Sequence, residues 1–280
     1  LVARGRDHMI NTPLQILLYE ALGAPVPRFA HLPMMLGANG QKLSKRHGAV
    51  SVGEYRDQGV PPAALLNYLV RFGWSFGDQE VFSLADLIEK FSWDRCGRGD
   101  GQFDPKKLAA IAFEHLKSPA LTSTEAYVEG TLPFLAKRGL ADVDRSVLEA
   151  AIPLVRERAE TFADAAAALD YVFRDPPAYE DKAVSKFLTA EKAANLPEIR
   201  ALLASEEDWS AAALEAKVTV WLGERGLELK HVAQSIRVAV TGRSASPGLF
   251  EVLALLGKER SLRRIDHGVA LATGSQKAAT

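Results

Sequence analysis

A glycine-rich basic segment, residues 37–48, carries the residue types best suited to chemistry. Its three glycines favour a loop, and Lys42, Lys45 and Arg46 place three cations within five positions. Backbone N–H groups beside glycine can approach an oxyanion, and the cations and Ser44 would add donors to a polyphosphate. The spacing matches neither a Walker A loop nor a G-x-G-x-x-G fingerprint. The residue types alone therefore leave two interpretations open, an anion-binding loop or a solvated basic turn.

The order Lys-Leu-Ser-Lys-Arg at residues 42–46 resembles the KMSKS-type loop of class I aminoacyl-tRNA synthetases, in the form used by bacterial glutamyl-tRNA synthetases. A five-residue motif is weakly specific, but other blocks resemble that family in the same order and spacing. These blocks are Arg4-Gly5-Arg6-Asp7-His8, Asn11-Thr12-Pro13, Phe29-Ala30-His31-Leu32-Pro33, Gly73-Trp74-Ser75 and Phe103-Asp104-Pro105-Lys106-Lys107-Leu108.

The resemblance implies an ATP-dependent ligase that activates L-glutamate and transfers it to the glutamate tRNA, with the glutamine tRNA left open as a second acceptor. ATP would bind with Mg²⁺ as a substrate. Lys45 and Lys42 match the catalytic lysines of the loop, and Ser44 and Arg46 match positions that shape the ATP site. Asp7 matches an acidic position near the ATP ribose or base, with helix capping as its alternative.

Arg4 matches the family arginine that lines the amino-acid pocket. There a guanidinium would pair with the side-chain carboxylate of glutamate. The alternative is an ordinary salt bridge at the end of a strand.

The elements that must position these residues begin at the first residue. Leu1-Val2-Ala3-Arg4 is typical of the end of a buried strand, and Asn11-Thr12-Pro13 predicts the start of a helix that ends at Gly23. Apolar residues within this helix, Ile16, Leu17, Tyr19 and Leu22, predict a face turned to a core. No His-x-Gly-His signature occurs, so we expect the chain to begin inside a catalytic domain and to lack its first half.

The fold class expected from the resemblance is mainly α. Residues 1–52 would form the second half of a Rossmann-type catalytic domain with its KMSKS-type loop, and residues 53–118 a helical stem-contact domain. Residues 119–175 and 176–280 would form two helical subdomains of an all-α anticodon-binding domain, with the break Asp175-Pro176-Pro177 between them.

Residues 53–118 contain two further helix starts and one departure from the family. Pro61-Pro62 and Ser83 predict helix starts, followed by apolar stripes that are typical of a core. After Lys107 the family usually has a bulky residue and an asparagine, where this chain has Ala110 and Ala112. We therefore expect altered packing or altered RNA contact near Ala112.

The segment 232–253 also resembles the family, at its anticodon-binding end. Ser246 is predicted to cap a helix that starts at Pro247, with Leu249 or Phe250 as an apolar surface for unstacked bases. Arg237 would supply a cation to a base edge. For Phe250 a place in the core is the alternative.

Composition limits the remaining classes. The chain has 280 residues, 48% of them hydrophobic, and a formal net charge of −1, so nucleic-acid binding must use local basic patches. A second patch, Lys258 to Arg264, fits either RNA contact or cations at a helix C-terminus. The single cysteine, Cys96, excludes an intrachain disulfide and a cysteine-based zinc site, and no metal site is expected. We expect a cytoplasmic monomer without a membrane span.

Two functions remain open for this chain. The first is a part of a glutamate–tRNA ligase, and the second is a tRNA-binding module that does not activate an amino acid.

Overall fold

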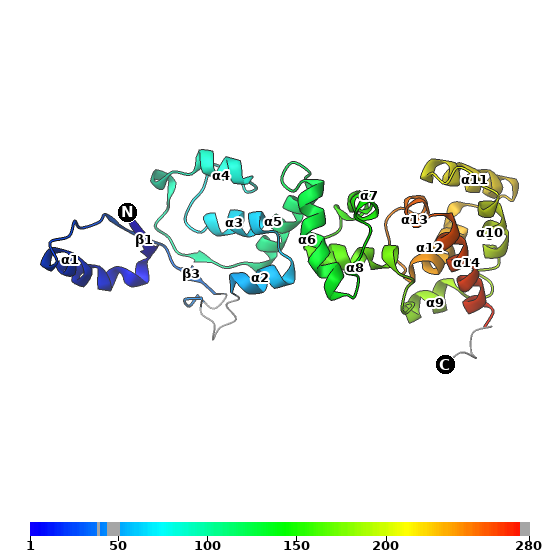
Figure 1. Cartoon of the computed structure of the whole chain (residues 1–280), viewed down its shortest axis with the longest axis horizontal. Coiled ribbons are helices and arrows are strands. Elements are labelled where there is room, and N and C mark those ends of the chain that lie inside the picture. The colour runs from blue at the N-terminus through cyan, green and yellow to red at the C-terminus, as the bar shows by residue number, and fades with distance from the viewer. Residues whose placement is uncertain (38–39, 44–50, 275–280) are drawn as a thin grey trace. The chain divides into compact units, whose positions relative to one another are not determined.

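The computed structural model describes residues 1–37, 40–43 and 51–274, and it is mainly helical, as expected (Figure 1). The chain divides into two compact units. Unit 1 comprises Leu1–Ser123 and Arg158–Phe162, and unit 2 comprises Thr124–Glu157 and Ala163–Thr280. All strands of the described residues lie in unit 1.

Unit 1 begins with a parallel pair of strands. β1 (Val2–Gly5) pairs with β2 (Phe29–Leu32) in a register that sets Arg4 opposite His31. Parallel neighbours need a crossover connection, which η1 (Arg6–Asn11) and α1 (Thr12–Ala21) supply. The predicted strand and helix are therefore confirmed at this end of the chain, but the expected burial of the strand is wrong, because the residues of β1 are exposed or only partly buried.

The predicted core face of α1 is wrong for this structure. Leu17 is 60% exposed and Leu22 is 80% exposed, and α1 has no buried residue. A helix face is buried only where another layer covers it, and the main neighbour of α1 is the short helix η1. The apolar face of α1 is therefore a surface in the described chain.

The rest of unit 1 packs α3 against α5. Ala64, Leu65 and Tyr68 of α3 meet Leu108 and Ile111 of α5 in a buried cluster. The elements here are β3 (Met35–Leu36), α2 (Val52–Gln58), α3 (Pro62–Val70), α4 (Leu84–Lys90), η3 (Trp93–Arg95), β4 (Gly101–Gln102) and α5 (Pro105–Lys117).

Local signals set the starts of these helices. Pro62 opens α3 as predicted, and Ser83 caps α4 in a capping box with Asp86. Ala112 is 1% exposed and lies in the α3–α5 core, whereas Ala110 is exposed. Position 112 therefore contributes to packing and is closed to contact with RNA.

Unit 2 is built from helices alone among its described residues. α12 packs against α14 and α9, α14 against α10, α11 against α13, and α6 against α7. The break predicted at Asp175-Pro176-Pro177 is confirmed, because α8 ends at Phe173. The helices are α6 (Thr124–Lys137), α7 (Arg145–Val155), α8 (Phe162–Phe173), α9 (Asp181–Phe187), α10 (Leu196–Ala204), α11 (Ala211–Glu224), η4 (Leu229–His231), α12 (Ala233–Thr241), α13 (Leu249–Leu256) and α14 (Lys258–Ala272).

Candidate functional site

Arg4 projects from β1 into a group of neutral hydrogen-bond partners. Its Nη2 donates to Thr12 Oγ1 at 2.9 Å and to Gln15 Oε1 at 2.5 Å. Thr12 Oγ1 also lies 2.9 Å from His31 Nε2 on the neighbouring strand, and the guanidinium carbon lies 5.4 Å from the centre of the Phe29 ring. The parallel register of β1 and β2 brings these groups together.

No carboxylate of the described residues balances the charge of Arg4. Within the described residues Arg4 makes no ion pair, so the strand-end salt bridge considered above is not formed. Its Nε atom is buried and has no hydrogen-bond partner in the part of the chain that the structure describes. A partly buried guanidinium held by neutral groups retains its attraction for an anion.

Asp7 and Lys42, both predicted for the ATP site, form an ion pair. Lys42 Nζ donates to Asp7 Oδ2 at 2.6 Å, and this hydrogen bond lowers the pKa of the Asp7 carboxyl. β3 positions Lys42, because Lys42 bridges Leu36 and the next residue, Leu43, donates its N–H to Met35 O at 2.9 Å. The N-cap residue of η1 is Gly5, so Asp7 is not the capping residue but lies in the first turn of η1.

The other predicted residues of the basic loop, Ser44, Lys45 and Arg46, lie outside the described residues. Their assignment to catalysis and ATP binding stays a prediction.

Sequence reasoning missed Asp100 as a residue that orders this region. Its Oδ1 accepts from the Met34 N–H at 2.8 Å, and its Oδ2 accepts from Arg6 Nη2. Asp100 thereby ties the segment after β1 and the segment before β3 to the start of β4. The partners are 66 and 94 positions away in sequence, so no local pattern marks this role.

Arg237 and Ser246, predicted for the anticodon, are in contact. α12 positions Arg237, and its Nε donates to Ser246 Oγ at 2.9 Å. Ser246 lies in the loop between α12 and α13, residues 242–248, which we call the 242–248 loop. Two of the four predicted anticodon residues therefore lie side by side.

The predicted helix start at this loop is wrong. α13 begins at Leu249 with Gly248 at its N-cap, and no side chain caps it. Ser246 Oγ instead donates to Pro247 O at 2.9 Å, and Pro247 precedes the helix. The hydroxyl of Ser246 is thus engaged by Arg237 and Pro247 and does not face the first N–H groups of α13.

The expected apolar surface at Leu249 is also wrong. Leu249 and Phe250 are each 5% exposed, because α13 turns this face toward α11, α12 and α14. Phe250 therefore lies in the core, which was the alternative considered for it.

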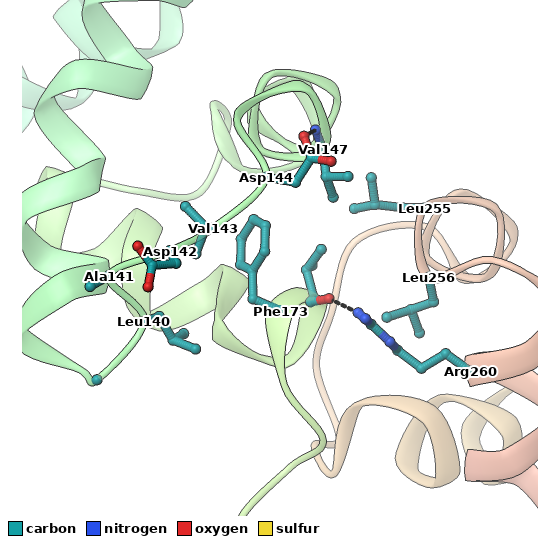
Figure 2. A pocket seen from close by; sticks show the side chains of 12 residues that line it. Leu140, Ala141, Asp142, Val143, Asp144, Val147, Phe173, Leu255, Leu256 and Arg260 are labelled. Atoms are coloured by element: carbon teal, nitrogen blue, oxygen red, sulfur yellow. Dashed lines mark hydrogen bonds between the residues drawn. The ribbon is translucent and has the colours of Figure 1, made fainter.

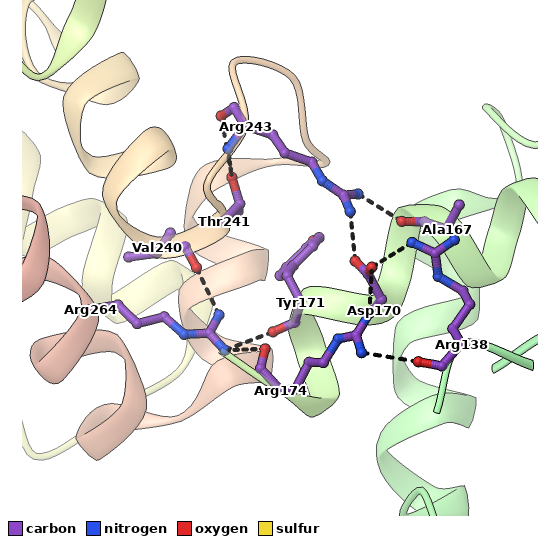
Figure 3. A network of polar contacts seen from close by, with 9 residues as sticks. All are labelled: Arg138, Ala167, Asp170, Tyr171, Arg174, Val240, Thr241, Arg243 and Arg264. Carbon is purple, nitrogen blue, oxygen red and sulfur yellow. Dashed lines mark hydrogen bonds and ion pairs between the residues drawn. The ribbon is translucent and has the colours of Figure 1, made fainter. Parts of the chain in front are cut away.

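The second basic patch stabilises the fold. Its residues lie in the first two turns of α14, so the expectation of cations at their own helix C-terminus is wrong. Arg264 has a 3% exposed side chain and donates to Val240 O at 2.7 Å and to Tyr171 O at 2.8 Å (Figure 3). These carbonyls belong to the last turns of α12 and α8, and the burial of Arg264 excludes RNA contact by this side chain. Lys258 likewise donates to Glu206 O.

A pocket of about 560 Å³ lies in unit 2 (Figure 2). The loop 139–144, Val147 of α7, the end of α8, Leu255, Leu256 and Arg260 line it. Its lining combines apolar side chains, among them Leu140, Phe173 and Leu256, with the carboxylates of Asp142 and Asp144. Val172 O accepts a hydrogen bond from Arg260 Nη1. Arg260 of the second basic patch lines this pocket, whereas the residues predicted for the ATP, glutamate and anticodon sites do not.

The described residues form no metal site, and the environment of Cys96 disfavours a nucleophilic thiolate. Across residues 1–37, 40–43 and 51–274, no group of three or more His, Cys, Asp or Glu side chains is placed to hold a metal ion. Burial raises the pKa of the Cys96 thiol, which disfavours the nucleophilic thiolate. No helix in the described part of the chain is long and apolar enough to cross a membrane.

Two family models match the chain. The anticodon binding domain matches residues 126–269, and the catalytic domain of class I tRNA synthetases (E and Q) matches residues 1–110. These matches cover both groups of predicted residues.

Curated relatives and solved structures agree with these models. A glutamate–tRNA ligase of Geotalea uraniireducens (strain Rf4) is 45% identical over 270 residues, and one of Anaeromyxobacter sp. (strain Fw109-5) is 46% identical over 271 residues. These alignments cover 96% and 97% of this chain, and the chain spans 57% of the length of each relative. The crystal structure of a glutamate tRNA ligase from Elizabethkingia meningosepticum CCUG26117, in complex with its amino acid, superposes with a TM-score of 0.80 at 26% identity, over 96% of this chain and 56% of that one.

Proposed function

The chain belongs to the class I glutamate–tRNA ligase family, and on this premise we propose that the protein joins L-glutamate to tRNA at the expense of ATP. The observation that carries this proposal is that one chain combines a catalytic-domain segment, residues 1–110, with an anticodon-binding domain, residues 126–269. The chain would contribute the KMSKS-type loop, part of the glutamate pocket and the recognition of the anticodon.

Activation of glutamate is attack of a carboxylate on the α-phosphate of ATP, with pyrophosphate as leaving group. The protein must align the two anions and stabilise the charge that spreads over the phosphates. We assign that stabilisation to Lys45 and Lys42, with Ser44 and Arg46 shaping the loop and Asp7 beside the nucleotide. Mg²⁺ would enter with ATP, because the resemblance implies it.

Arg4 is proposed to bind the side-chain carboxylate of glutamate. The support is its uncompensated charge together with the three side chains that orient it, Thr12 and Gln15 directly and His31 through Thr12. A guanidinium fixed in this way offers its remaining N–H groups to a planar carboxylate.

Anticodon recognition is proposed for Arg237 and Ser246, with Pro247 as part of the same loop. Their contact is the support, since it holds a cation and a hydroxyl at one place on unit 2. The tRNA for glutamate is the expected partner. Binding measured side by side with the tRNA for glutamine would decide whether that tRNA is accepted as well. We further propose a cytoplasmic monomer.

A second candidate function is tRNA binding without amino-acid activation by this chain alone. The observation that favours it is the exposed apolar face of α1, where Leu14, Leu17 and Leu22 are 60% to 80% exposed. A catalytic domain that leaves such a face uncovered lacks a packed layer on that side.

Glutamate-dependent exchange between ATP and pyrophosphate separates these functions, measured on the chain of 280 residues with tRNA present. Exchange that Lys45→Ala abolishes would establish activation by this chain. Absence of exchange, together with salt-sensitive binding of the glutamate tRNA, would establish the binding module. Failure of both exchange and tRNA binding would contradict both proposals.

A further inference from the structure

A buried carboxylate in unit 2 gathers three guanidinium groups. Asp170 lies in the last turn of α8, and its side chain is only 6% exposed. Its Oδ2 accepts from Arg138 Nη2 at 2.7 Å and lies 3.5 Å from Arg174 Nη2, while its Oδ1 accepts from Arg243 Nη2 at 2.6 Å (Figure 3). These three partners come from three different parts of unit 2.

The arginines gather here because helix C-termini meet at this place. Arg174 Nη1 donates to Arg138 O, just after α6, and Arg243 Nη1 donates to Ala167 O in α8. Arg264 covers the last carbonyls of α8 and α12. Carbonyl ends of helices attract cations, and Asp170 offsets part of the positive charge that accumulates among them.

Arg243 connects this network to the 242–248 loop. The next residue, Ser244, is held from another side, because Glu180 Oε2 accepts from its N–H at 3.1 Å and from its hydroxyl at 3.0 Å. Glu180 N also donates to Gly242 O at 2.9 Å. Arg237 then holds Ser246 two residues further on.

The loop therefore has anchors at three of its seven residues in addition to its backbone. Asp170 holds the loop by its bond to Arg243, and Glu180 holds it by its bond to Ser244. The third anchor is the bond from Arg237 to Ser246. A loop fixed before it binds loses less conformational entropy on binding and keeps its donors at defined places, which favours discrimination between bases.

We propose that Asp170 and Glu180 are positioning residues for anticodon recognition, holding the 242–248 loop through Arg243 and Ser244 without touching RNA themselves. This inference rests on the proposed role of Arg237 and Ser246 at the anticodon. According to this inference, the ability of the loop to discriminate between anticodon bases depends on two carboxylates, Asp170 of α8 and Glu180 just before α9.

The test measures binding of the whole chain to two RNA hairpins by fluorescence anisotropy. One hairpin carries the glutamate anticodon, and the other has one anticodon base replaced. Asp170→Asn should bind the first hairpin about tenfold more weakly and lose most of the preference over the second. The slope of affinity against salt should stay as in the wild type, since no phosphate contact is removed.

Arg243→Gln and Arg138→Gln are compared because each loses one bond of similar length to the same carboxylate. Arg243→Gln also loses the bond to Ala167 O, which anchors the loop to α8 as well. Only Arg243 lies in the 242–248 loop. Arg243→Gln should therefore lose discrimination, whereas Arg138→Gln should keep it within about twofold. The double variant of Asp170→Asn and Arg243→Gln should discriminate no worse than Arg243→Gln alone, because the two residues act as one unit.

Glu180→Gln tests the second anchor and remains informative if Asp170→Asn does not fold. It should also lower discrimination while its thermal unfolding stays near that of the wild type.

Three results would overturn the inference. Full discrimination by both Arg243→Gln and Glu180→Gln would show that the anchors do not matter. Equal losses in Arg138→Gln and Arg243→Gln would show a general effect on stability. A salt slope reduced by about one in Arg243→Gln would show a direct phosphate contact. If the wild type itself binds the two hairpins equally, the proposed role of the loop at the anticodon is wrong. That result is distinct from the three above, in which the wild type discriminates and only the positioning role of Asp170 and Glu180 is wrong.

Discussion

Lys42 Nζ lies 2.6 Å from Asp7 Oδ2, although 35 positions separate the two residues. Both side chains are exposed enough to meet a ligand, at 60% for Lys42 and 31% for Asp7. In this state the lysine of the basic loop is neutralised by the acid expected beside the nucleotide. A phosphate group that binds Lys42 must therefore compete with Asp7. Under the proposed function, ATP would be that competitor and would release the carboxylate.

Removal of Lys42 should raise the pKa of Asp7. The hydrogen bond from Lys42 is the largest cause of the lowered value, so Lys42→Ala should return the Asp7 pKa toward its ordinary value of 3.8. Carboxyl chemical shifts of Asp7 followed by NMR over pH 2 to 6 would measure this. Lys106→Ala serves as the control, and an unchanged Asp7 titration in Lys42→Ala would contradict the ion pair.

His115 should make unit 1 less stable in acid. Its side chain is fully buried, Nε2 lies 3.1 Å from Asn67 Oδ1, and Nδ1 has no partner. Burial lowers the pKa of His115 below 6.5 in the folded state, so the unfolded chain takes up a proton first as the pH falls. The free energy of unfolding should therefore decrease below pH 6.5, by at most about 1.4 kcal/mol per pH unit for one proton.

Urea unfolding of the wild type and of His115→Gln between pH 7.5 and 5 tests this expectation. Glutamine can keep the donor to Asn67 but cannot take up the proton. The difference in stability between the two proteins should shrink or reverse toward pH 5. Parallel curves over the whole range would contradict the role of His115.

Arg264 and Arg263 should differ greatly in their contribution to stability. Both bind Asp175, but the side chain of Arg264 is 3% exposed and that of Arg263 is 56% exposed. Arg264→Met leaves buried carbonyls of Tyr171 and Val240 without their donor, and should cost about 2–4 kcal/mol. Arg263→Met breaks an exposed ion pair and should cost about 0–1 kcal/mol. Chemical denaturation followed by circular dichroism would measure both, and similar costs would show that the carbonyl contacts matter little.

Gly242 should tolerate a side chain less well than Gly226. Both have positive φ angles, at 74° and 63°, so alanine is strained at each. An added Cβ at Gly242 would lie 2.9 Å from Pro176 Cβ, whereas one at Gly226 would meet nothing within 4 Å. Gly242→Ala should therefore be less stable than Gly226→Ala by about 1–2 kcal/mol. Melting temperatures measured side by side would detect the difference, and equal values would show that Pro176 yields without cost.

Local residue patterns predicted the elements that local chemistry controls. Pro62 and Ser83 start helices where expected, and the prolines after Asp175 follow the end of α8. At Ser246 the same reasoning failed, because the contact with Arg237 from another helix engages the hydroxyl that would have capped α13. A capping pattern predicts a helix start only when the capping side chain is not hydrogen-bonded to a residue distant in sequence.

By itself the sequence determined the order of helices and predicted two groups of candidate site residues, since both depend on residue types at short spacings. Only the tertiary structure decided which cations are available to a ligand. Arg264 is buried against the ends of two helices, α8 and α12, and Lys42 is paired with Asp7. Among the described residues, no carboxylate pairs with Arg4. These outcomes depend on residues dozens of positions away, because burial and charge pairing are set by the packing of whole elements and not by neighbours along the chain.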